Sequence, residues 1–310
     1  MRYGGPRLTS VLLFLVLLVG CGTRGGSDPT YRPTESVLEA VSVLRLHIDD
    51  DTYRFPPARD FTGKNVYRAV FERLESLEEI HAAKFQSGYL TAVILFAKGR
   101  ALERLGEYEI AAQHYRRVTD LDSILVDEAR RSEYVCERLS EARVTRPEPV
   151  ASPQEALHVF DRRAALLEEL LEEVEGTHYT PVVREEIERT DVERARYYRA
   201  RRLLNPALEA VALQQYQRLV RQNRESKFQN RHLLKLGDLY AELARDYAHR
   251  FPPPSLSFDP ATFDEYAFGA TRLYEAVAHQ DGAIEKIEAA RKLEAFLAFT
   301  IGARDATLQR

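Results

Sequence analysis

The distribution of proline places the strongest limit on what this chain can fold into. Proline ends helices and interrupts strands, because its ring fixes φ and removes a backbone donor. The 310-residue chain has no proline from 58 to 146, and the later ones fall at 147–153, 181, 206, 252–254 and 260. The stretches between them carry apolar residues at helical spacing, with no long alternation of apolar and polar residues that would indicate a strand. The sequence therefore predicts an all-α fold whose helices end near the prolines.

Short cap motifs mark several helix boundaries. Ser152-Pro153-Gln154-Glu155 is a capping box with proline at the first helical position. We expect the helix that it begins to end near Gly176, because glycine readily adopts the left-handed conformation that follows many helices. Thr180-Pro181 and Asn205-Pro206 are expected to begin the next two helices.

The first 21 residues have the pattern of an exported, lipid-modified protein. Arg2 and Arg7 precede the apolar run VLLFLVLLV at 11–19, which has the length of a signal-peptide core and is too short to span a bilayer. The run ends in Leu18-Val19-Gly20-Cys21, which resembles the lipobox of bacterial lipoproteins. The resemblance implies a signal peptide at 1–20, a diacylglyceryl thioether on Cys21 and an acyl chain such as palmitate on the new amino terminus. An ordinary secretory signal that happens to end in cysteine is the alternative.

Residues 21–36 are predicted to form a flexible tether between this anchor and the fold. Several acyl chains anchor stably, since each buried methylene contributes about 0.8 kcal/mol. Gly22 occupies the position where an aspartate retains some lipoproteins in the inner membrane. The resemblance therefore implies a location in the cell envelope, on the periplasmic face of the outer membrane.

Charge and cysteine content limit the classes of partner. Removal of residues 1–20 changes the net charge from −4 to −6, because it takes away two arginines and no acid. This balance argues against nucleic acid as a partner. Cys136 is the only other cysteine, so a lipidated Cys21 leaves no pair for an intramolecular disulfide.

Residues 99–118, GRALERLGEYEIAAQHYRRV, carry small and aromatic residues at the spacing of a helix–turn–helix unit. Gly106 would end the first helix, and Ala111 is small where two helices must approach closely. Tyr115 would return on the inner face of the second helix. This pattern resembles the tetratricopeptide repeat, whose period is about 34 residues. Counting Gly99 as the first-helix glycine places the best repeat at 92–125.

A second, interrupted copy of this pattern begins at residue 230. The matching positions are Leu233, Leu236, Gly237 and Tyr240 in the first helix, then Ala270, Tyr274 and Val277 after a proline-rich loop. Residues 281–299, DGAIEKIEAARKLEAFLAF, would form a terminal helix pair or cap. The resemblance implies an α-solenoid of stacked tetratricopeptide-like helical hairpins. A generic helical bundle is the alternative.

These patterns together predict the domain organisation. It comprises the signal peptide 1–20, the tether 21–36, N-terminal helical repeats 37–142, a linker 143–151, a charged helical hairpin 152–204, and C-terminal helical repeats with a cap 205–310. In the hairpin, we expect the acidic run at 166–175 to face the arginine-rich segment 184–202. The charges would then pair across the seam of the hairpin. A charged docking strip is the alternative.

A lipid-modified cysteine followed by such repeats resembles the lipoprotein of the outer-membrane barrel-assembly machinery. One run is also similar to the repeats of that group and of the periplasmic cell-division coordinator: Gln217-Arg218-Leu219-Val220, Ser226-Lys227 and Leu236-Gly237-Asp238. The resemblance implies a lipid-anchored scaffold that binds other envelope proteins or peptide segments through its repeats, in outer-membrane assembly.

No motif for catalysis or cofactor binding stands out in the sequence. The HExxH, GxSxG, paired CxxC and Rossmann glycine patterns are absent, and Gly63-Lys64 lacks the rest of a phosphate-binding loop. His47 followed by Asp49, Asp50 and Asp51 is interpreted as an acidic helix end and turn rather than a cation site. We therefore expect no enzymatic activity, no metal and no cofactor.

The resemblance to tetratricopeptide repeats also implies a binding surface, since the first helix of each repeat lines a concave groove in that family. The implied groove residues are Phe96, Arg100, Arg104, Arg130, Tyr134, Arg138, Arg231 and Leu234. Arginine and tyrosine are efficient contact residues, and arginine binds carboxylates in a bidentate manner. An acidic or C-terminal peptide segment is therefore the expected ligand. A solvated groove in which Glu103 and Glu137 neutralise the arginines is the alternative.

Two functions remain open at this point. A scaffold that holds envelope proteins together would use an open groove or its capping helices. A ligand-binding accessory lipoprotein of a transport system would instead enclose an apolar cavity or pore.

Overall fold

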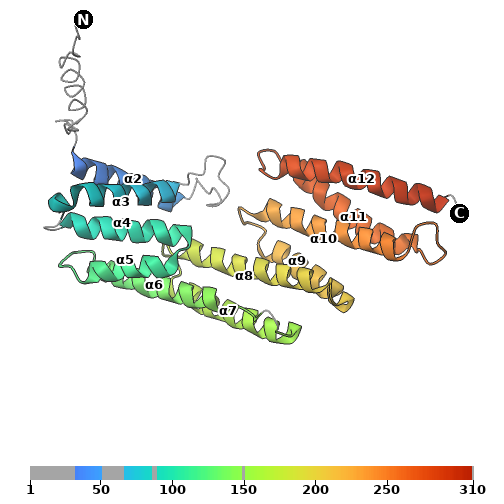
Figure 1. Ribbon diagram of the computed structural model, residues 1–310, viewed down its shortest axis with the longest axis horizontal. Helices are drawn as coiled ribbons and strands as arrows, with labels where there is room; N and C mark the ends of the chain where they lie inside the picture. Colours follow the sequence, from blue (N-terminus) through green and yellow to red (C-terminus); the bar gives the residue numbers. More distant parts are fainter. Residues whose placement is uncertain (1–31, 51–65, 86–88, 149–150, 309–310) are drawn as a thin grey trace, which may run out of the picture. The chain divides into compact units, whose positions relative to one another are not determined.

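The structure, a computed structural model, describes residues 32–50, 66–85, 89–148 and 151–308. Every regular element within these ranges is helical, which confirms the predicted all-α class. The helices are α2 (Pro33–Asp50), α3 (Val66–Phe85), α4 (Tyr89–Leu105), α5 (Tyr108–Thr119), α6 (Val126–Val144), α7 (Pro153–Glu173), α8 (Thr180–Arg201), the short 3-10 helix η1 (Pro206–Leu208), α9 (Glu209–Gln222), α10 (Gln229–Arg250), α11 (Pro260–Ala278) and α12 (Lys286–Leu308) (Figure 1). Among them, no helix combines the length and apolar character that a membrane span requires. The predicted signal peptide and Cys21 lie outside the described residues.

The predicted cap motifs set helix boundaries as expected. Ser152 and Glu155 form a reciprocal capping box, in which Glu155 N donates to Ser152 Oγ at 3.2 Å and Ser152 N donates to Glu155 Oε2 at 2.7 Å. Gly176 has a φ of 74°, which glycine adopts without strain, and it follows the end of α7. Asn205 caps η1 through a hydrogen bond from Ala207 N to its Oδ1 at 3.1 Å. Local chemistry therefore determined these boundaries.

Two predicted boundaries differ from the observed ones. The tether was expected to run to residue 36, but α2 begins at Pro33. Proline is well tolerated in the first turn of a helix, because its missing N–H has no intrahelical partner there. The linker was expected from residue 143, but α6 continues to Val144.

The chain divides into two compact units, residues 1–130 and 131–310. In the first unit α3 packs on both α2 and α4, and α4 packs on α5 (Figure 1). One core cluster joins α2, α3 and α4 and includes the fully buried Val37, Leu74 and Ala101. Burial of each leucine-sized side chain contributes roughly 1.5–3 kcal/mol, so this cluster stabilises the packing of α2, α3 and α4.

The α4–α5 pair forms the helix–turn–helix unit that the sequence predicted at 92–125. Gly106 makes the turn with a φ of 78°. Gly99 lies directly against the ring of Tyr115, since a Cβ built on the glycine would lie 2.7 Å from Tyr115 Cε1. Ala111, Tyr115 and Val118 are all buried. The small residues therefore allow the two helices to approach closely, as expected.

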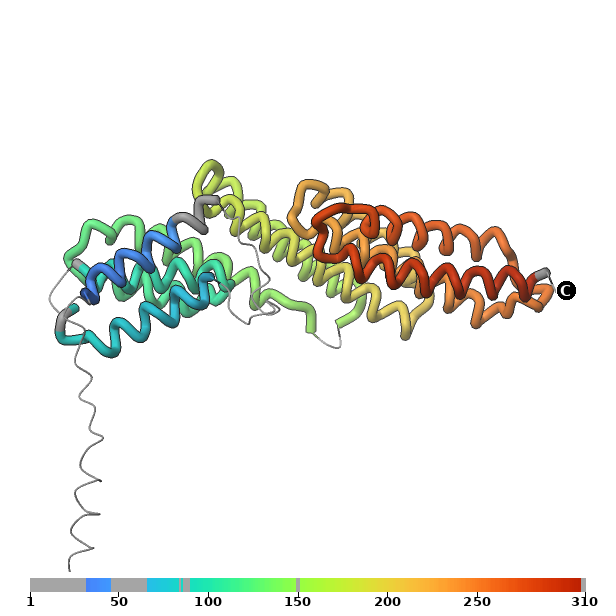
Figure 2. Tube along the Cα trace, turned by 90° about the horizontal axis from the view of Figure 1, so that it is seen from above, coloured from blue at the N-terminus to red at the C-terminus, as the bar shows by residue number. Residues whose placement is uncertain are grey.

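In the second unit α7 packs on α8, α8 on α9, α9 on α10, α10 on α11, and α11 on α12. Figure 2 traces α10, α11 and α12 side by side. The α10–α11 hairpin repeats the glycine–tyrosine contact, because a Cβ on Gly237 would lie 3.0 Å from Tyr274 Cε1. A reciprocal contact joins Gly269 of α11 to Tyr240 of α10, at 2.7 Å from the built Cβ. The expected second-helix pattern thus resumes after the proline-rich loop.

Candidate functional site

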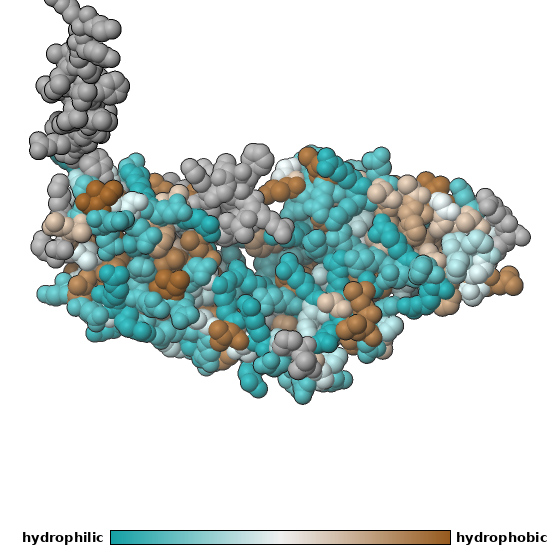
Figure 3. All heavy atoms as spheres, in the orientation of Figure 1, coloured by the Kyte–Doolittle hydropathy of each residue, from teal (hydrophilic) through white to brown (hydrophobic). Residues whose placement is uncertain are grey.

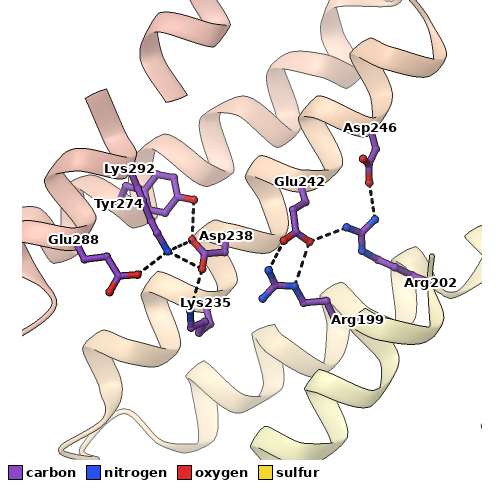
Figure 4. A network of polar contacts seen from close by, with 9 residues as sticks. All are labelled: Arg199, Arg202, Lys235, Asp238, Glu242, Asp246, Tyr274, Glu288 and Lys292. Carbon is purple, nitrogen blue, oxygen red and sulfur yellow. Dashed lines mark hydrogen bonds and ion pairs between the residues drawn. The ribbon is translucent and has the colours of Figure 1, made fainter. Parts of the chain in front are cut away.

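A row of carboxylates follows one edge of α10. Asp238, Glu242 and Asp246 occur at four-residue intervals, so they lie above one another along the helix. We call these three residues the α10 acid stripe. Figure 4 shows the stripe between arginines of α8 and a lysine of α12. It therefore connects three helices that are far apart in the sequence.

Two arginines of α8 bind Glu242 and Asp246, the C-terminal part of the stripe. Arg199 Nε donates to Glu242 Oε2 at 3.2 Å, and its Nη2 also donates to the same carboxylate. Arg202 donates to Glu242 Oε2 and to Asp246 Oδ2, each at 2.7 Å. Burial raises the pKa of Glu242, but the hydrogen bonds from Arg199 and Arg202 outweigh it and hold the pKa below its ordinary value.

A lysine of α12 binds the other end of the stripe. Lys292 Nζ lies 2.8 and 2.9 Å from the two oxygens of Asp238, and Tyr274 donates its hydroxyl to Asp238 Oδ1 at 3.0 Å. Lys235 Nζ is a third donor at 3.3 Å. Burial is the largest single effect and would raise the pKa of Asp238, but the hydrogen bonds from Lys292 and Tyr274 and the charges of Lys292 and Lys235 together lower it below its ordinary value. The carboxylate is therefore held in its ionised form.

This arrangement is suited to fixing helices rather than to acid–base chemistry. A general acid or base needs a pKa near the working pH, whereas the pKa shifts of Asp238 and Glu242 both move away from neutrality. Each carboxylate is also occupied by cationic donors from a neighbouring helix. The stripe was missed at the level of sequence, because its partners on α8, α11 and α12 lie 36 to 54 residues away and form no local motif.

The structure brings together the predicted groove residues Phe96 and Arg100, but it buries the arginine. The Arg100 guanidinium stacks on the Phe96 ring at 5.0 Å and donates to Glu128 at 2.9 Å and Glu103 at 3.3 Å. Only 9% of Arg100 is exposed. The expectation that Arg100 is offered to a ligand is therefore wrong, because carboxylates of its own unit already bind it. Arg104 is half-buried on the same helix.

The next three predicted groove residues lie on α6. Arg130 is exposed and 3.8 Å from Asp127. Tyr134 donates its hydroxyl to Glu173 at 3.0 Å, and Arg138 donates to Glu169 at 3.0 Å. Both acceptors belong to α7, so this face of α6 is turned toward the next helix. Part of the acidic run at 166–175 therefore pairs with α6 rather than with the arginine-rich segment as expected.

Ion pairs do join α7 to α8, but on the α7 side they use Asp161 and Arg163, which precede the acidic run at 166–175. The pairs are Arg163 with Glu193 at 2.6 Å and Arg194 with Asp161 at 3.2 Å. Both arginines are fully buried. Buried cations are stable only when they are paired, so these contacts specify how the two helices pack.

The last two predicted groove residues, on α10, have opposite environments. Arg231 is partly exposed, lies 3.6 Å from Glu285 and stacks over the Phe228 ring at 5.2 Å. Leu234 is only 1% exposed and belongs to the core cluster that includes Phe263 and Phe296. Leu234 is therefore wrong as a groove residue, because it faces the core of the second unit.

A Ser–Glu–His group with a buried glutamate and histidine was not found from the sequence. Ser226 donates to Glu188 Oε1 at 2.6 Å, and His232 Nε2 contacts the same oxygen. In a nucleophilic triad the imidazole lies between the hydroxyl and the acid. Here the carboxylate is in the middle, so the group joins α8 to α10 and does not activate the serine.

Other sites that could hold a ligand were sought across the described residues. Among these there is no group of three or more histidine, cysteine, aspartate or glutamate side chains placed to bind a metal. The side chains of His47, Asp49, Asp50 and Asp51 lie outside the part whose side chains are described. No protein-family model matches the sequence, and no curated protein matches it at a significant level.

Proposed function

We propose that the protein is a lipid-anchored scaffold of the cell envelope that binds other proteins or peptide segments through tetratricopeptide-like helical hairpins. One observation carries the proposal: the same packing recurs in separate hairpins. Gly99 meets the Tyr115 ring between α4 and α5, and Gly237 meets the Tyr274 ring between α10 and α11. In both cases the tyrosine follows a buried alanine by four residues.

A third helix supports the repeat. The buried positions with the spacing alanine, tyrosine four residues later and an aliphatic residue three further on are Ala111-Tyr115-Val118, Ala212-Tyr216-Leu219 and Ala270-Tyr274-Val277. They lie in α5, α9 and α11, each of which packs on the helix before it. Stacked hairpins of this kind present extended surfaces, and their common use is the binding of other proteins.

The anchor in this proposal is Cys21 with its preceding signal-like segment. The cysteine test is sharp, because the chain has only two cysteines. Cys21→Ser is expected to move the protein from the membrane fraction to the soluble fraction of fractionated cells. Cys136→Ala is the matched control, since Cys136 is fully buried and should leave the anchor intact. Retention of Cys21→Ser in the membrane fraction would rule out the lipid anchor.

Site-specific crosslinking in intact envelopes tests the scaffold itself. A photo-crosslinking residue would replace Arg130, an exposed member of the predicted groove, or Arg231, a partly exposed one, and Glu109 on α5 would serve as control. The scaffold predicts that defined proteins are trapped at the two arginine positions and not at Glu109. Recovery of lipid or small molecules alone would favour the transport alternative. Equal trapping at all three positions would count against a groove.

A further inference from the structure

Helix α12 is apolar on two opposite faces. One face contains the buried Ala289, Phe296 and Ala303, which pack in the core of the second unit. The other exposes Ile287 by 67%, Ile301 by 58% and Leu297 by 38%. In Figure 3, brown and light brown atoms gather on this part of the surface. Large apolar side chains that gather on an exposed helix face mark an interaction site, and among the described residues no element covers this one.

The exposed face forms a regular seam. Its central positions on α12 are Ile287, Arg291, Glu294, Ala298 and Ile301, all of which are exposed; Ile284, in the turn before the helix, is exposed as well. Their spacing alternates between three and four residues, which is the spacing of positions that meet a partner helix in a coiled coil. Ala290 and Ala295 flank the seam, and their small side chains would let a second helix approach closely.

The middle of the seam carries two opposite charges. Among the described residues, the structure gives no ion pair to Arg291 or Glu294. Other charged residues of α12 are paired within the unit: Lys292 lies 2.8 Å from Asp238, and Arg304 lies 2.8 Å from Asp264. Arg291 and Glu294 thus point away from the core with their charges available to a partner.

The order of these residues makes the seam complementary to itself. If two α12 helices run antiparallel about a two-fold axis between residues 292 and 293, Ile301 of one lies beside the turn of the other that contains Ile284. Ile287 then faces Ala298, and Arg291 faces Glu294. Along the centre of the seam, apolar residues therefore meet apolar residues, and each charge meets its opposite. A two-fold interface requires this self-complementarity, because the same surface is used twice.

We propose that the exposed face of α12, from Ile287 to Ile301, is an interface with a second copy of this chain, in which the two α12 helices pack antiparallel. The apolar ends of the seam supply the burial, and the two symmetric Arg291–Glu294 contacts select the register. The proposal is independent of the lipid anchor and of what the hairpins bind.

A charge exchange tests the register. The full chain is purified in detergent micelles, and light scattering that separates protein mass from detergent mass gives its association state over a concentration series. Arg291→Glu places two pairs of like charges in the interface, and so does Glu294→Arg. Each is expected to raise the dimer dissociation constant about tenfold or more. The double variant restores both contacts in reverse and should return the constant to near the wild-type value.

A second variant tests the apolar part of the seam. Ile301→Asp should abolish the dimer, whereas Ile124→Asp, at a loop residue of the first unit that is 83% exposed, should leave it unchanged. Circular dichroism checks that each variant is folded. A wild-type chain that is monomeric at all concentrations would overturn the proposal. So would a double charge variant that stays as weak as the single ones, or a face that captures only a different protein.

Discussion

The contact between Gly99 and Tyr115 leads to a quantitative prediction about Gly99→Ala. A Cβ on residue 99 would lie 2.7 Å from Tyr115 Cε1 and 2.8 Å from its Cζ, closer than real contacts allow. The ring cannot easily move away, because Tyr115 is fully buried and its hydroxyl donates to Glu103 Oε2 at 3.0 Å. The added methyl group must therefore displace α4 from α5 or break this hydrogen bond.

Two opposing effects set the change in the free energy of unfolding that Gly99→Ala causes. Alanine is favoured over glycine inside a helix by about 1 kcal/mol. Overpacking of a close contact costs roughly 1–3 kcal/mol. Gly99→Ala should therefore range from neutral to about 2 kcal/mol destabilising. Gly302→Ala is the matched control, since a Cβ at that helical position has no neighbour within 4 Å, and it should stabilise by up to about 1 kcal/mol.

Hydrogen exchange, resolved to peptides of α4, α5 and α12, measures the effect of Gly99→Ala in the first unit and that of Gly302→Ala in the second unit. The measurement is made at a dilution at which the chain is monomeric, because Gly302 adjoins the proposed interface. Gly99→Ala should accelerate exchange in α4 and α5 relative to the wild type. The reasoning would be refuted if Gly99→Ala slowed exchange in α4 as much as Gly302→Ala slows it in α12, because tight packing would then have no cost.

Three further predictions follow from individual contacts. Ser152→Ala removes the capping box of α7 and should destabilise the second unit by about 1 kcal/mol in urea unfolding; Ser36→Ala, a partly exposed serine early in α2, should cost less. Glu242→Gln should lower the free energy of unfolding of the second unit at neutral pH and make it depend less on pH in the acid range. The pKa of Glu242 is lowered in the folded protein. The ionised carboxylate of the wild type therefore contributes stability above the ordinary glutamate pKa, and this contribution is lost as pH falls through the folded pKa. Equal acid dependence of both proteins would contradict this. Burial, with added repulsion from Lys98 and Arg117, lowers the pKa of His114 to about 4. The NMR signals of His114 should therefore show a neutral ring at pH 5.5. Because the folded protein disfavours the charged ring, the free energy of unfolding should fall as pH drops from about 6.5 toward 4. A His114 titration midpoint near 6.5 would refute the burial argument.

Several features of the fold could be predicted because they depend on neighbouring residues. The capping box at Ser152 and the left-handed glycines at 106 and 176 act within one turn of the backbone. The Gly99–Tyr115 contact spans one tight hairpin, so its spacing is also visible in the sequence. The candidate site was less accessible to such reasoning. Arg100 and Leu234 were assigned to a groove by position in a repeat, and the structure buries both.

The sequence by itself determined where several helices begin and end and that nearly the whole described chain is helical, because caps, glycine turns and apolar periodicity act over a few residues. Only the tertiary structure decided which charges meet. Glu169 pairs with Arg138 of α6 instead of α8, and the α10 acid stripe joins arginines of α8 to a lysine of α12. These pairings depend on how each helix is rotated against its neighbours, and that rotation is set by packing of all the contacting side chains together.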